Sequence, residues 1–176
     1  MVSSLPRSDG GQMPRRLLLI GFDARGVALV REALRTRDGA TYTVDSVRSA
    51  ADALRRLGRP HSHGTIAAGG YAALIVDFVL AQGPQSDTYD QLYVAAHPTP
   101  VLVLCSRADE AMARLAVQRG AEDYLLKEHV DGYLLPKTLC SMIERAVIAD
   151  KLFEAQERAQ VTLNSCLLYT SDAADE

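Results

Sequence analysis

Short apolar runs of the sequence end at residues whose side chains are able to do chemistry. Asp77 follows the run ALIV, Cys105 and Ser106 follow VLVL, and Lys127 follows YLL. A further run, LLLI, ends at Gly21-Phe22-Asp23. Together they offer carboxylates, a thiol, a hydroxyl and an ammonium, the groups that proteins use for nucleophilic attack, metal binding and ion pairing.

The apolar runs predict strands, because each is short and is followed by a helical pattern. These strands are residues 17–20, 73–76, 101–104 and 123–126, and the short β-branched stretch 42–44 predicts one more strand. Helices are expected between them, and in the one before residue 120 the inward residues are Met112, Leu115 and Ala116. Gly120 is expected to end that helix. The last helix is expected to begin between Asp131 and Leu135, with Pro136 in its first turn.

Five strands that alternate with five helices predict an open parallel sheet with helices on both faces, an α/β doubly wound fold. Ligands of such sheets bind at the carboxyl ends of the strands, where the polar residues described above would meet.

Length and composition are consistent with one folded domain and exclude several classes of protein. The chain has 176 residues, 48% of them hydrophobic, and no apolar run reaches the roughly 20 residues of a membrane span. Residues 1–15 are mostly Ser, Pro, Arg and Gly, which predicts a disordered leader. They lack the apolar segment of a signal peptide. Three scattered cysteines favour a cytoplasmic protein, and a net charge of −3 favours neither nucleic acid nor a membrane as a partner.

Three stretches, ALIVDFVL, PVLVLCSRADEA and RGAEDYLLKEHVD, make residues 16–148 resemble the receiver domain of response regulators in two-component signalling. The resemblance implies a flavodoxin-like (βα)5 fold with strand order 2-1-3-4-5. It also implies a regulatory module, not an enzyme, whose partner is a histidine kinase or a phosphotransfer protein.

The resemblance assigns roles to individual residues. Asp77 matches the phosphoacceptor, and Lys127 matches the lysine that pairs with the phosphoryl group. Cys105 stands where the family has a hydroxyl that stabilises this group, with Ser106 as the neighbouring substitute. Tyr124 matches the aromatic residue that reports the switch between states. The implied cofactor is Mg²⁺.

The sequence departs from the family where the metal should bind. Gly21 and Phe22 replace the two adjacent acids, which leaves Asp77 and Asp23 as the only candidate metal ligands. Mg²⁺ prefers carboxylate oxygens, which glycine and phenylalanine do not offer. In receiver domains the residue after the lysine is usually Pro or Gly, and here that residue is Glu128. We therefore expect a receiver-like module with a degenerate acidic pocket that signals through partner or interdomain contacts. The alternative is a working receiver in which a histidine kinase phosphorylates Asp77.

Other chemistry has weaker support in the sequence. The loop Gly21-Phe22-Asp23-Ala24-Arg25-Gly26 is followed by Val27-Ala28, where a phosphate-binding loop needs Lys and Ser or Thr. His61 and His63 lie two residues apart in a polar loop without a third metal ligand nearby. Cys105 is a redox candidate if Lys127 lies close enough to lower the pKa of its thiol.

The last helix is expected to extend past the domain. Met142, Ala146, Ala149 and Phe153 follow a 4-3-4 seam that is consistent with a homodimer, and the alternative is one long terminal helix that is partly frayed. Residues 149–165 form a predicted helical linker, because FEAQERAQVTLNS resembles the connector to a PAS domain in cyclic-di-GMP signalling proteins. Residues 166–176 resemble translated sequencing adapter. We therefore expect a non-native tail and a missing PAS or cyclase-type output domain.

Overall fold

The computed structural model describes residues 14–35, 42–58, 70–81 and 86–172. Most of the predicted leader, and most of the polar loop between residues 59 and 70, lie outside these ranges. His61 and His63 lie there too, so the structure does not test whether they bind a metal.

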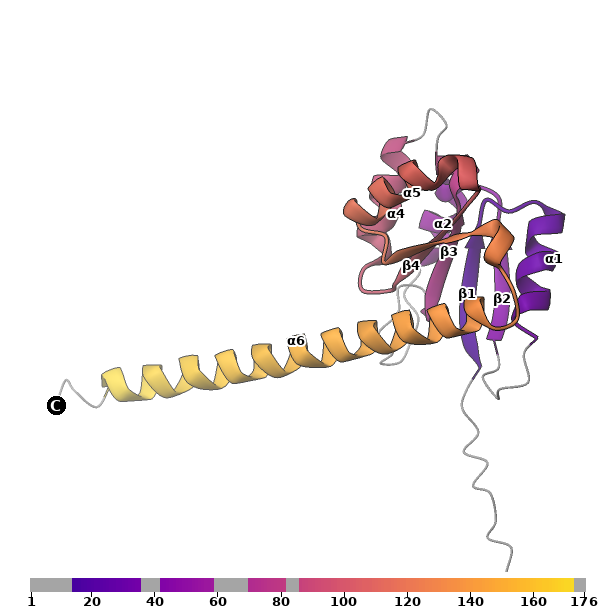
Figure 1. Cartoon of the computed structure of the whole chain (residues 1–176). Helices are drawn as coiled ribbons and strands as arrows, with labels where there is room; N and C mark the ends of the chain where they lie inside the picture. The colour runs from indigo at the N-terminus through magenta and orange to yellow at the C-terminus, as the bar shows by residue number, and fades with distance from the viewer. Residues whose placement is uncertain (1–13, 36–41, 59–69, 82–85, 173–176) are drawn as a thin grey trace, which may run out of the picture.

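Five parallel strands form one sheet at the centre of the molecule (Figure 1). They are β1 (Arg15–Ile20), β2 (Tyr42–Val47), β3 (Ala73–Asp77), β4 (Val101–Cys105) and β5 (Asp123–Leu126). Their order is β2-β1-β3-β4-β5, which confirms the predicted flavodoxin-like topology. The sheet therefore places the ends of β1, β3, β4 and β5 along one edge.

Helices cover both faces of the sheet. The helices are α1 (Ala24–Ala33), α2 (Ala50–Leu57), α3 (Phe78–Ala81), α4 (Ser86–Ala96), α5 (Glu110–Gln118) and α6 (Leu134–Asp172). Short 3-10 turns lie at Arg107–Asp109 and Lys127–His129. The sequence pattern did not predict α3, because four residues are too few to show a helical period.

Strand alternation divides the core into two clusters. Leu18, Ile20, Leu74 and Val76 face α2, α4 and α5, and their neighbours Leu17, Leu19 and Ile75 face α1 and α6. The first cluster is called here the α5-side core and the second the α6-side core. Both faces of β3 and β4 are buried, which explains why these strands are continuous apolar runs.

Polar caps and a glycine set the ends of the helices. The Asp23 carboxylate accepts a hydrogen bond from the Gly26 amide at the start of α1, and Ser49 caps α2 in the same way. Gly120 has a φ of 123°, a conformation that L side chains rarely adopt, and it follows the end of α5 as predicted.

The predicted inward face of α5 is partly wrong. Met112 and Leu115 are 51% and 43% exposed, whereas Ala113 and Ala116 are buried against the sheet. Small residues allow the helix to approach the strands closely. The large side chains of Met112 and Leu115 therefore lie on a neighbouring face of the helix that is more exposed. Ala116 is the one residue of the predicted face that is buried.

Helix α6 begins within the predicted window and has Pro136 in its first turn. Its buried side chains are Leu135, Leu139, Met142 and Ile143. Val147 also packs against the α6-side core, and Arg145 pairs with Glu122 over 3.6 Å. Ala146, Ala149 and Phe153 line a cavity together with residues of the domain, and the far part of the helix projects outward (Figure 1). It runs without a break through residues 149–165 and on to Asp172, and the division of the chain at 165 stays a prediction. Among the described residues, no helix has the length and apolar character needed to cross a bilayer.

Candidate functional site

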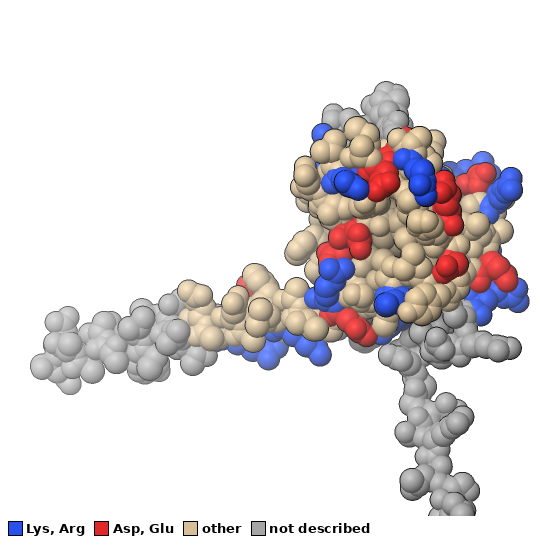
Figure 2. Space-filling view, viewed as in Figure 1, with Lys and Arg blue, Asp and Glu red and all other residues tan. Residues whose placement is uncertain are grey.

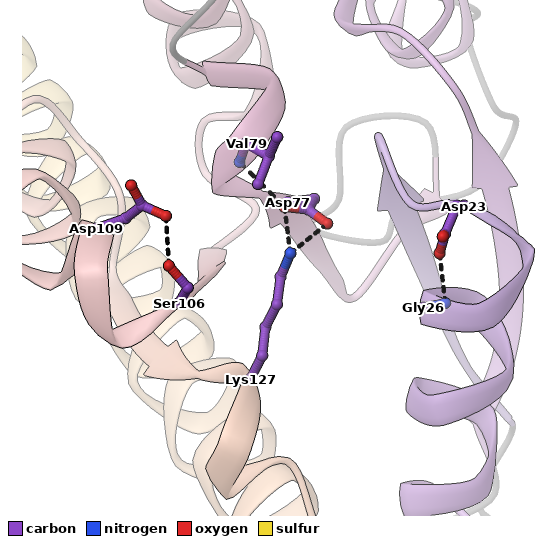
Figure 3. A network of polar contacts seen from close by, with 7 residues as sticks. All are labelled: Asp23, Gly26, Asp77, Val79, Ser106, Asp109 and Lys127. Carbon is purple, nitrogen blue, oxygen red and sulfur yellow. Dashed lines mark hydrogen bonds and ion pairs between the residues drawn. The ribbon is translucent and has the colours of Figure 1, made fainter.

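The structure brings Asp77 and Lys127 together at the carboxyl edge of the sheet (Figure 3). Asp77 is the last residue of β3, and Lys127 begins the turn after β5. The Lys127 Nζ atom lies 2.8 Å from each Asp77 carboxylate oxygen. The Val79 amide also donates to Asp77 Oδ1 over 3.0 Å, so the same carboxylate caps α3. The side chains are 13% exposed for Asp77 and 33% for Lys127, which shields the ion pair from most of the solvent.

The end of β1 holds a buried aromatic ring where metal-binding acids would stand. Phe22 is 6% exposed and packs in the α6-side core. A Cβ atom on Gly26 would lie 2.9 Å from the Phe22 ring, so the glycine leaves room for this packing. Gly21 has a φ of 88°, and its amide donates to the Val47 carbonyl over 2.8 Å. An aspartate at position 21 would therefore be strained.

The predicted metal ligand Asp23 does not face Asp77. Its Oδ1 atom lies 2.7 Å from the Gly26 amide nitrogen, and the side chain points along α1 (Figure 3). Both Asp77 oxygens are already bonded to Lys127. Within the described ranges, no group of three or more His, Cys, Asp or Glu side chains is arranged to hold a metal ion. These residues do not fit Mg²⁺, which requires several oxygen ligands in octahedral geometry.

Cys105 lies in the α5-side core and Ser106 bonds to Asp109, so the structure shows other contacts for both residues than the predicted ones. Cys105 is fully buried in the α5-side core, on the face of β4 opposite its neighbour Leu104. Burial, together with the nearby Glu110 and Asp109, raises the pKa of the Cys105 thiol more than Lys127 lowers it. Full burial and a raised thiol pKa favour a buried strand-end cysteine over an activated redox thiol. Ser106 donates to the Asp109 carboxylate over 2.5 Å and points away from Asp77 (Figure 3).

Tyr124 is held by charged residues of α5. Its hydroxyl donates to Glu110 Oε1 over 3.2 Å and accepts from Arg114 Nε over 3.2 Å. Arg114 also pairs with Glu110 over 2.9 Å, and hydrogen bonds from Arg114 and Tyr124 lower the pKa of the Glu110 carboxyl. Glu110 and Arg114 were not predicted from the sequence, although their spacing of four residues was a signal for a helical ion pair. The role of Tyr124 as a switch remains a prediction.

A cavity of about 450 Å³ opens beside the Asp77–Lys127 pair. Its walls are partly apolar and are formed by Phe22, Leu29, Val79 and Leu104. Arg25 also lines the cavity. Sequence reasoning missed Arg25, Leu29 and Val79, because nothing local in the sequence shows that α1 and α3 face each other across the ends of the strands.

Comparison with known structures identifies the fold. The structure is similar to a chain described as adenylate cyclase from Rhodopirellula baltica, with a TM-score of 0.63 and 16% identity, over 82% of this chain and 98% of that one. It is also similar to the signal receiver domain of a putative Luxo repressor protein from Vibrio parahaemolyticus, with a TM-score of 0.61 and 21% identity, over 80% and 98%.

A response regulator from Thermotoga maritima gives a TM-score of 0.58 at 20% identity, over 75% of this chain and 99% of that one. The fold is therefore that of CheY-like receiver domains, which confirms the fold that the sequence motifs implied. No protein-family model and no curated protein sequence matches the chain.

Proposed function

We propose that this chain, which has the fold of a response-regulator receiver domain, is a regulatory module of two-component signalling that works without metal-dependent phosphorylation. It would act through contacts with a partner protein or an attached domain, with α6 as the element that transmits its state. A PAS or cyclase-type domain is the attached partner that the sequence of residues 153–165 predicts.

The end of β1 carries this proposal. Phosphoryl transfer to a carboxylate depends on a metal ion that stabilises charge on the transferred group. Here a buried phenyl ring occupies the position of one metal-binding acid, and a glycine with positive φ occupies the other. Asp23 is committed to capping α1. Compared with the family pattern, the loop at the end of β1 therefore differs both in its side chains and in its backbone conformation.

The second candidate function is phosphorylation of Asp77 by a histidine kinase or a phosphotransfer protein. The observation in its favour is the ion pair, because a receiver with a phosphoacceptor keeps a lysine beside its aspartate. The pair is also explained as a structural contact, since Lys127 neutralises a carboxylate that is needed to cap α3.

We expect the full chain not to bind Mg²⁺ at this site. Adding millimolar MgCl₂ should produce no saturable shift in the amide resonances of Gly21, Asp23 and Asp77 in a two-dimensional NMR spectrum, because three ligating carboxylates are not available there. The Asp77→Asn variant serves as the control and should respond identically. Saturable shifts that are lost in Asp77→Asn would support the second candidate function instead.

The proposed contact of α6 is with a second copy of the chain. Ile148, Leu152 and Phe153 of α6 are 66%, 62% and 60% exposed. Basic side chains gather along one edge of the projecting part of α6, and its upper side in the view is largely uncharged (Figure 2). The predicted seam needs correction, because Met142 is fully buried and is not available to a partner. The other three seam residues, Ala146, Ala149 and Phe153, line a cavity of about 590 Å³ together with residues of the domain itself.

Sedimentation velocity of the full chain is expected to show a dimer that Leu152→Glu converts to a monomer. The substitution places a charge among apolar side chains that a second helix would cover. Lys151→Glu changes a neighbouring exposed residue without removing apolar surface, and it should leave the dimer intact. A monomer at all concentrations, or equal effects of both substitutions, would exclude this contact.

A further inference from the structure

The cavity beside the ion pair has the character of a small-molecule site. Its volume of about 450 Å³ falls within the range of roughly 300–1,000 Å³ that is usual for ligand pockets. Leu29 and Val79 line it and are 43% and 62% exposed, and Phe22 and Leu104 provide buried walls. Exposed apolar side chains beside a concave surface are typical of binding sites.

The charges in the cavity are balanced except at Arg25. Asp77 is paired with Lys127, and the Asp23 carboxylate accepts from an amide at the positive end of α1. No carboxylate of the described residues forms an ion pair with the Arg25 guanidinium. Arg25 and Leu29 stand four residues apart on α1, so their side chains share one face of the helix. A ligand that covers Leu29 would therefore bring its polar end to Arg25.

We propose that this cavity binds a small amphipathic anion, an aromatic or branched alkyl group that carries one carboxylate. The apolar part would lie against Phe22, Leu29 and Val79, and the carboxylate would pair with Arg25, whose planar guanidinium suits a carboxylate. The inference rests on the proposed function, because a site that held Mg²⁺ and a phosphoryl group would need polar walls. Binding there would couple a metabolite to the region where α1, α3 and the strand ends meet.

The test compares matched probes on the full chain by two-dimensional NMR. 3-Phenylpropionate carries the carboxylate, and 3-phenylpropan-1-ol has the same aromatic group without a charge. We expect 3-phenylpropionate to shift the amides of Phe22, Leu29 and Val79 saturably, and the alcohol to bind about tenfold more weakly, since an arginine–carboxylate contact is charge-assisted. Arg25→Gln should reduce the affinity for the acid to that for the alcohol. Arg31→Gln, on the same helix but outside the cavity lining, should change neither.

Val79→Asp provides a second variant, which should weaken both probes because it removes an apolar wall. Equal affinity for acid and alcohol, no effect of Arg25→Gln, or equally tight binding of inorganic phosphate would overturn the inference. Saturable shifts caused by MgCl₂ alone would instead contradict the proposed function, so the two failures are distinguishable.

Discussion

Substitution of Lys127 by methionine is expected to lower the free energy of unfolding by about 2 kcal/mol. Methionine keeps most of the aliphatic side chain but removes the ammonium that bonds both Asp77 oxygens. The Asp77 carboxylate would remain largely buried. Of the hydrogen bonds described above, it would keep only the one from the Val79 amide. Removal of one partner from a buried ion pair is costly because the other charge stays unpaired. The partial exposure of Lys127 keeps the expected loss below the full range for deeply buried pairs.

Urea unfolding of Lys127→Met, Asp77→Asn and the double variant measures this effect. Asp77→Asn should cost less than Lys127→Met, because the lysine left behind is one-third exposed and can be hydrated. The double variant should lose less stability than the sum of the two single changes, since each removes the same contact. Lys151→Met, at an exposed position on α6, is the matched control. A change for Lys127→Met within about 0.5 kcal/mol of that control would mean that the pair contributes little to stability.

The sheet and the ion pair were predictable from the sequence for physical reasons. β3 and β4 are buried on both faces and are therefore continuous apolar runs, whereas β2 is half-exposed and was indicated by its β-branched residues. Carboxyl ends of neighbouring parallel strands meet at one edge, so residues that follow β3 and β5 were expected to lie close together. The contact between Asp77 and Lys127, 50 residues apart, follows from this arrangement.

The packing around the site was less predictable because it depends on residues distant in sequence or on small side chains. The sequence showed that Phe22 replaces an acid, but not that Gly26 makes room for the ring or that Gly21 adopts a positive φ. In α5, hydropathy drew attention to Met112 and Leu115, whereas the alanines face the sheet. Strand alternation places Cys105 in the α5-side core, and its role beside a phosphoryl group stays a prediction.

The second prediction concerns the chemistry of Asp77, which we expect to remain unphosphorylated. Attack on phosphorus by a carboxylate oxygen places negative charge on the transferred group, and the charge of a single ammonium, that of Lys127, lies against the Asp77 carboxylate. Charge that develops on the phosphoryl group would also lack a metal ion, because Gly21, Phe22 and Asp23 do not supply ligands. Loss of several kcal/mol of charge stabilisation slows such a transfer by about a thousandfold or more.

The decisive measurement is intact-protein mass spectrometry of the full chain after incubation with acetyl phosphate and Mg²⁺. Wild type and Asp77→Asn are compared, each with and without the metal, and a conventional receiver domain serves as the positive control for the reagent. We expect that neither protein gains the mass of a phosphoryl group while the positive control is labelled. Efficient, Mg²⁺-dependent labelling of the wild type that is absent in Asp77→Asn would contradict it and establish a working phosphoacceptor.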